Sequence, residues 1–105
     1  MRSGPPRDPE TTALHREMGF ARREFFSRLE KLLDNQGCRI HEDGASVALG
    51  RGTVTIRVGA EGERRLSEHV RFPILPVTLV FDGVDPADKG EFLRRFDHGF
   101  MKGLG

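Results

Sequence analysis

The chain has one cysteine, no tryptophan and no tyrosine among its 105 residues. A single cysteine cannot form an intramolecular disulfide or a thiol cluster for zinc, so neither can stabilise this chain. The eight phenylalanines therefore carry all of the aromatic packing. No apolar run approaches the roughly 20 residues that span a membrane, and the first ten residues lack the apolar segment of a secretory signal. We therefore expect a cytoplasmic protein.

Charge of one sign is also lacking, because 17 basic and 16 acidic side chains give a formal net charge of +1. The balance holds along the chain: residues 1–35 contain seven basic and six acidic groups, and residues 36–105 contain ten of each. General nucleic-acid binders normally carry a strong excess of positive charge. Any basic patch must therefore come from segregation in the folded chain. Arginine far outnumbers lysine, as codon usage in a GC-rich bacterial genome would produce.

We expect a disordered tail at residues 1–13 and a single domain at residues 14–105. The first ten residues combine three prolines and a glycine with charged groups, so they bury too little apolar surface to offset the entropy of ordering. The spacing of Phe25, Leu29 and Leu33 then predicts an amphipathic helix. Gly37 is suited to its C-terminal end.

Apolar and polar residues alternate over the middle of the chain, which is typical of half-buried strands. The pattern predicts strands over residues 38–42, 45–49, 53–58, 64–72 and 77–81. Asp43-Gly44 favours a type I′ turn between the first two strands.

Two features interrupt this alternation near its end. Pro73 and Pro76 lack a backbone N–H, so we expect them to separate the last two strands. Glu68 falls on the apolar side of the 64–72 strand, which indicates a bulge near Ser67 or an edge position.

A second helix is predicted to begin after Asp85, which is expected to cap it, and to continue to Lys102. Phe92 and Phe96 lie on its apolar face. Hairpin-length connections require antiparallel neighbours, and two amphipathic helices need one shared apolar surface. We therefore predict an α+β two-layer sandwich. Its antiparallel sheet of four to five strands is flanked by an N-terminal and a C-terminal helix on one face.

The uncovered face of this sheet is the candidate binding surface, because its polar side chains are rich in arginine and histidine. The candidate contact residues are Arg39, His41, Arg57, Arg65, His69 and Arg71. Guanidinium groups bind carboxylates and phosphates bidentately, so their convergence would form a site for an anionic ligand or a protein partner. The alternative is a set of solvated side chains paired with nearby glutamates, which contribute little.

The sequence disfavours nucleic acid as a partner. Helix–strands–helix order also occurs in double-stranded-RNA-binding domains, which place lysines where this chain has Asp85 and Asp88. Readers of single strands stack bases on exposed aromatics, and no phenylalanine falls on the polar side of a predicted strand.

No cofactor, metal site or catalytic constellation is indicated, and we do not expect an enzyme. The four histidines lack the short spacings of metal ligands. Cys38 begins a strand, where a cysteine usually behaves as a small hydrophobe. The Gly50-Arg51-Gly52 segment lacks the helix start of a phosphate loop.

Three functional hypotheses follow. The first is a small cytosolic bacterial accessory domain, non-catalytic, that contacts a protein partner or an anionic ligand through the arginine-rich face. The second is a structural homodimer formed through the sheet. The third is an enzyme with a small-molecule pocket between helices and sheet.

Overall fold

The computed structural model describes residues 11–33 and 38–101. Within them the chain forms, in order, β1 (Thr11–Met18), α1 (Arg22–Leu32), β2 (Cys38–His41), β3 (Gly44–Leu49), β4 (Gly52–Val58), β5 (Gly62–Arg65), β6 (Arg71–Asp82) and α2 (Pro86–Gly99). The predicted antiparallel α+β class is confirmed. The six strands found in this part of the chain exceed the four to five expected.

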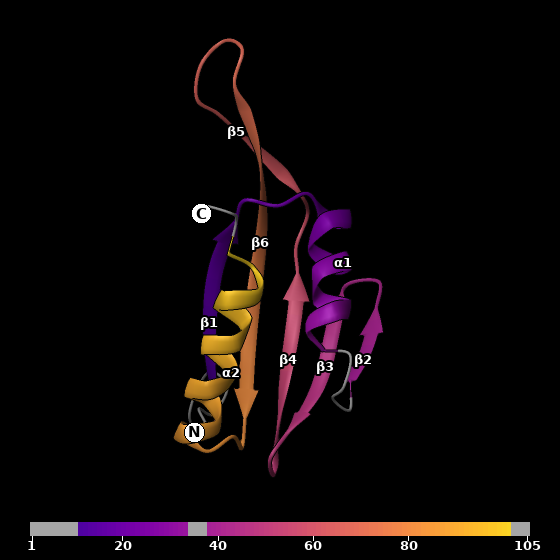
Figure 1. Ribbon diagram of the computed structural model, residues 1–105, viewed down its shortest axis with the longest axis vertical. Coiled ribbons are helices and arrows are strands. Elements are labelled where there is room, and N and C mark those ends of the chain that lie inside the picture. Colours follow the sequence, from indigo (N-terminus) through magenta and orange to yellow (C-terminus); the bar gives the residue numbers. More distant parts are fainter. Residues whose placement is uncertain (1–10, 34–37, 102–105) are drawn as a thin grey trace, which may run out of the picture.

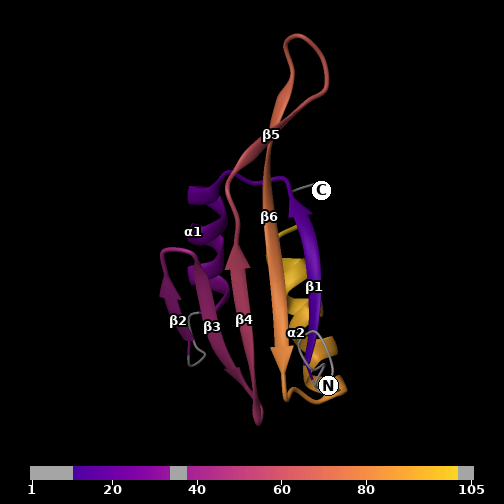
Figure 2. The ribbon, with the colours of Figure 1, turned by 180° about the vertical axis from the view of Figure 1, so that it is seen from behind.

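Strand β6 pairs with three other strands, more than any other strand in the described part of the chain. The strand order is β1-β6-β4-β3-β2, every pairing is antiparallel, and β5 pairs with the first residues of β6. Figure 1 shows both helices in front of the sheet, and Figure 2 shows the sheet from the side that they leave uncovered.

Strand β1 corrects the expected tail boundary, because residues 11–13 already pair with β6. The pairing continues to Met18, which lies opposite Leu75. Leu14 and Met18 pack against the core, and between them Arg16 forms an ion pair with Asp97 of α2. A strand with only two apolar positions on its inner side gives too weak an alternation to be read from the sequence. Residues 1–10 lie outside the described part.

The core lies between the two helices and the inner side of the sheet. On the sheet side it contains Ala45, Val47, Val54, Ile56, Val58, Leu75, Val77, Leu79 and Phe81. The helices contribute phenylalanines whose rings contact one another: Phe100 lies 4.8 Å from Phe25 and 4.7 Å from Phe96 between ring centroids. The side of each helix that the apolar spacing predicts is therefore the side that packs in the core.

Two local predictions need correction. Glu42 and Asp43 form the β2–β3 turn, and among the described residues only glycines have positive φ, so the turn is not type I′. Asp85 occupies the cap position of α2 but makes no capping hydrogen bond, because its carboxylate pairs with Arg51 at 3.2 Å. Gly37 and Lys102, expected at the helix ends, lie outside the described residues.

Strand β6 is continuous through both prolines, contrary to prediction. The carbonyls of Val70 and Pro76 accept hydrogen bonds from the backbone N–H groups of Leu66 and Gly59. The even-numbered residues of β6 therefore direct their backbone N–H and C=O groups toward β4 and β5. The nitrogen of Pro73 therefore faces the opposite edge, where β1 has ended at the level of Leu75. Proline is tolerated at such a position because no donor is required there.

Candidate functional site

The part of the sheet that projects furthest is a two-stranded arm, defined here as residues 62–74. It consists of β5, a tip at residues 66–70, and the first four residues of β6. Figures 1 and 2 show it extending past the ends of both helices. Consistent with that position, every residue from Gly62 to Phe72 is exposed.

A β-bulge at the base of the arm determines which side chains share a side. Val58 lies opposite Val77 and Gly62 lies opposite Ile74, so three residues on one strand face two on the other. The extra residue reverses the alternation: even-numbered residues point to the helices in β4 and away from them in β5. A bulge also increases twist, and the chain leading from β4 into β5 crosses β6 in both views (Figures 1 and 2).

This reversal places an apolar stripe on the arm away from the core. We define the arm stripe as Leu66, Val70, Phe72 and Ile74, which alternation assigns to one side of the ribbon. Leu66, Phe72 and Val70 are 58%, 47% and 42% exposed, respectively. The other large hydrophobic side chains with comparable exposure in the described part are Ile40 and Met101, which lie elsewhere. The arm is therefore where exposed apolar side chains gather.

The two edges of the arm are poorly suited to adding another strand. Along β6 the outward backbone positions are Arg71 and Pro73, and the proline has no N–H to donate. Along β5 they are Glu63 and Arg65, in a strand of only four residues. Short, charged or proline-containing edges resist edge-to-edge pairing. The arm therefore offers side chains rather than backbone for contact.

Charges beside the arm stripe are largely neutralised within the chain. Arg64 pairs with Glu17 of β1 at 3.4 Å, and Arg71 pairs with Glu63 at 3.8 Å. These exposed pairs contribute little to stability, but they leave the stripe flanked by balanced charge. Arg65 at the end of β5 and Glu68 at the tip form no ion pair with any described residue.

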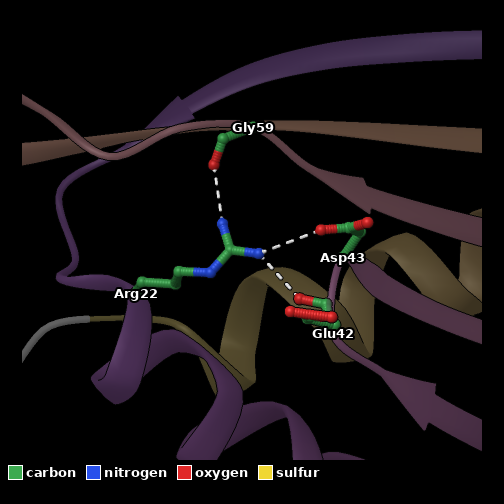
Figure 3. Close-up of polar contacts among 4 residues, drawn as sticks. All are labelled: Arg22, Glu42, Asp43 and Gly59. Carbon is green, nitrogen blue, oxygen red and sulfur yellow. Dashed lines mark hydrogen bonds and ion pairs between the residues drawn. The ribbon is translucent and has the colours of Figure 1, made fainter.

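Arg22, at the start of α1, fixes the base of the arm (Figure 3). Its guanidinium donates hydrogen bonds to the Gly59 carbonyl at 2.9 Å and the Glu42 carbonyl at 2.7 Å, and pairs with Asp43 at 3.5 Å. Its backbone N–H donates a hydrogen bond to the Glu61 carboxylate at 2.7 Å. A negative charge at this position interacts favourably with the positive N-terminal end of the helix dipole. We call this set the Arg22 anchor. It joins α1 to the β2–β3 turn and to the bulge.

The uncovered face of the main sheet holds three of the six predicted contact residues. Arg57 lies opposite Gly44, and Gly44 lies opposite His41, so two strand spacings of roughly 10 Å in total separate Arg57 from His41. Arg39 lies opposite Ser46, on the next row of this face. Neither Arg39 nor Arg57 forms an ion pair with a described residue.

The remaining three predicted residues, Arg65, His69 and Arg71, lie on the arm. Alternation places Arg71 on the helix side of β6 with Val77, whereas Arg57 lies opposite Thr78 on the other side. The six residues therefore do not share one face, contrary to the expectation that all of them lie on the uncovered face of the sheet. A bulge lies at residues 59–61, and Glu68, for which a bulge near Ser67 or an edge position was expected, is exposed beyond the end of β5, which pairs only with β6.

Sequence reasoning missed the two features that define the arm. Alternation in the 64–72 segment predicts that Leu66, Val70 and Phe72 lie on the buried side of their strand, but all three are exposed, and Phe72 is thus an aromatic side chain on an exposed strand face. The residues around Arg22 in the sequence give no indication of its partners, which lie 20 to 39 residues away. The extra residue at Gly59–Glu61 is the local signal for the reversal.

A second concentration of charge lies along the shallow groove between the helices. It consists of two hollows that share Leu32 and Gly99. One is lined by Arg23, Lys31 and the acidic Glu24 of α1, and the other by Arg94 and Arg95 of α2. Most of these cations lie in the second half of their helix, where positive side chains offset the helix dipole. That structural role accounts for their position without a ligand.

No group of three or more metal-ligating side chains occurs within residues 11–33 and 38–101. In the same residues, neither helix has the length and apolar character needed to cross a membrane.

No protein-family model matches the chain, and neither the curated proteins nor the solved structures contain a match. Fold and site thus define its class: an antiparallel α+β domain with a projecting β-arm. The particular features of this chain are the arm stripe and the Arg22 anchor.

Proposed function

We propose that the protein is a non-catalytic accessory domain that binds a protein partner through its arm. The observation that carries this proposal is the gathering of exposed Leu66, Val70 and Phe72 on an element that extends beyond the helices. Exposed apolar patches of this kind mark protein interaction sites more often than chance surface. The earlier candidates Arg65, His69 and Arg71 become the polar rim of this contact.

The chemistry of the arm constrains the partner. Because Arg64 and Arg71 already have intramolecular acidic partners, the contact does not require a strongly acidic surface. Because the arm edges resist strand addition, the partner must receive side chains. We therefore expect an uncharged surface of small or apolar residues that can accept the stripe.

The test is a binding measurement between purified proteins after a partner has been identified by crosslinking from position 72. Replacing Leu66 and Phe72 together with serine removes two side chains that are about half exposed, each expected to contribute about 1–1.5 kcal/mol on burial. Together they amount to about 2–3 kcal/mol, so the dissociation constant should rise by about 30- to 150-fold.

Met101→Ser is the matched control, because Met101 is also exposed but lies outside the arm. It should bind as the unaltered protein does. An unchanged affinity for the Leu66→Ser/Phe72→Ser variant, with the fold intact by circular dichroism, would show that the arm is not the docking element.

A further inference from the structure

We infer that the partner of the arm is a second copy of this chain, with each arm lying on the uncovered sheet face of the other copy. This inference rests on the proposed function, because it takes the arm as the docking element. It combines the only two large surfaces of the described sheet that neither helix covers, the arm and the open face (Figures 1 and 2).

The open face has the surface chemistry that the arm stripe requires. Its central row crosses four strands through Ala13, Val80, Thr55 and Ser46, which lie opposite one another in turn. These four side chains are small and uncharged, and the row ends at Arg39 of the edge strand β2, opposite Ser46. A stripe of larger apolar groups can therefore approach this row closely, without burying an unpaired charge.

The orientation of the two surfaces also agrees with a face-to-face arrangement. By alternation along β6, Phe72 and Ile74 lie on the same side of the strand as Thr78 and Val80. Two copies whose open faces oppose each other, with the arms antiparallel, bring each stripe toward the partner's face. This is the isologous contact of a two-fold dimer.

The dimensions fit as well. Six residue steps from Gly62 to Glu68 give an arm of about 20 Å, and four spacings between the five strands of the main sheet give a face about 19 Å wide. From these lengths, one arm with a ribbon width of about 10 Å covers roughly 200 Å², and the face offers roughly 400 Å². Each copy contributes its own arm and the part of its face that the partner's arm covers, so a reciprocal contact engages about 400 Å² on each copy. This is about half of the roughly 800 Å² per partner of stable interfaces, and we therefore expect a weak dimer that needs both contacts for most of its stability.

Unpaired charges complete the match. Glu68 at the arm tip has no ion-pair partner in the described chain, and neither have Arg39 and Arg57 on the open face. In the reciprocal dimer the tip carboxylate of each copy approaches these guanidinium groups of the other. Such pairs add orientation and specificity to an apolar contact.

The test measures the mass of the full chain by analytical ultracentrifugation at concentrations up to about 1 mM, the range that detects even weak dimers. The unaltered chain and Met101→Ser should dimerise. The arm variant Leu66→Ser/Phe72→Ser and the face variant Thr55→Arg should each be monomeric, with the dimer dissociation constant raised at least about 100-fold.

Mixing the two variants separates a reciprocal contact from other modes of association. The face variant has an intact arm and the arm variant has an intact face, so the mixture should form a heterodimer through one of the two contacts, weaker than the unaltered dimer. A mixture that associates no more strongly than either variant alone, neither of which retains an intact contact, would contradict the reciprocal arrangement.

The two proposals fail in different ways. A monomeric unaltered chain overturns the second-copy assignment alone, because the arm then remains available to a different protein. A dimer that the arm variant leaves intact also overturns the second-copy assignment, because such a dimer does not use the arm. The proposed function itself fails only when the arm variant leaves the affinity for a crosslinked partner unchanged.

Discussion

Replacing Arg22 with glutamine should loosen the arm while leaving the sheet folded. Arg22 is the one side chain that joins α1 to both Gly59 and Glu42, through hydrogen bonds from a charged donor to backbone carbonyls. Hydrogen bonds that involve a charged group contribute about 1.5–3 kcal/mol each. The Arg22 side chain is 33% exposed and glutamine retains a donor. We therefore expect a total loss of about 2–3 kcal/mol in the free energy of unfolding.

The assay is chemical denaturation combined with hydrogen exchange of the native protein. The amide of Gly59, bonded to Pro76, and that of Leu66, bonded to Val70, should exchange faster in the variant. The exchange rate of amides in the centre of β4, such as that of Ile56, should change only by the amount that follows from the change in global stability.

Arg23→Gln is the matched control. Arg23 is the next residue of α1, is exposed, and forms no ion pair with a described residue. Its replacement should change stability by less than about 0.5 kcal/mol. If Arg22→Gln costs no more than this control, or if exchange of the arm amides is unaffected, the Arg22 anchor does not hold the arm.

Gly44→Ala should cost about 3 kcal/mol or more, since a Cβ there would lie 1.8 Å from the Ile56 carbonyl oxygen. Gly90→Ala in α2, where the added Cβ meets nothing within 4 Å, should instead stabilise the fold by about 0.5–1 kcal/mol. Urea denaturation of both variants measures whether the free energy of unfolding falls for the first and rises for the second. Phe96→Ala should cost about 3–5 kcal/mol because the ring is fully buried, whereas Phe72→Ala should cost less than about 1 kcal/mol. Equal losses for the two phenylalanines would contradict the exposed position of the arm stripe.

The parts of the fold that could be predicted are those in which local pattern and packing agree. Val54, Ile56 and Val58 alternate over a strand whose inner side is fully used by the core. Phe92 and Phe96 recur at helical spacing and both are buried. In these segments each residue's neighbours along the chain suffice to indicate its surroundings.

Strand β1 could not be predicted in the same way, because its stability comes from its partners. Its paired residues in β6 lie 57 to 71 positions away in the sequence, and one of its inner positions is Arg16 rather than an apolar residue. Arg16 is accommodated only because Asp97 of α2 meets it. A long-range ion pair leaves no signature in the local sequence.

The position of the binding surface could not be predicted from the sequence for a related physical reason. Alternation shows which side chains share a side of a strand, but not whether anything covers that side. Leu66, Val70 and Phe72 do share a side, as the pattern indicates. One extra residue at the bulge turns that side away from the helices, and the arm then carries it past their ends.

The same geometry links the Arg22 anchor to binding. A two-stranded ribbon is at best marginally stable in water by itself, so the order of the arm must be supported from its base or by a partner. Without the Arg22 contacts, binding has to supply the free energy that orders the arm, and affinity falls although every stripe residue is intact. Arg22→Gln should therefore weaken arm-dependent dimerisation by about 10-fold or more, while Arg23→Gln leaves it unchanged. Sedimentation of both variants measures this, and equal dimer stability would show that the arm is ordered independently of its anchor.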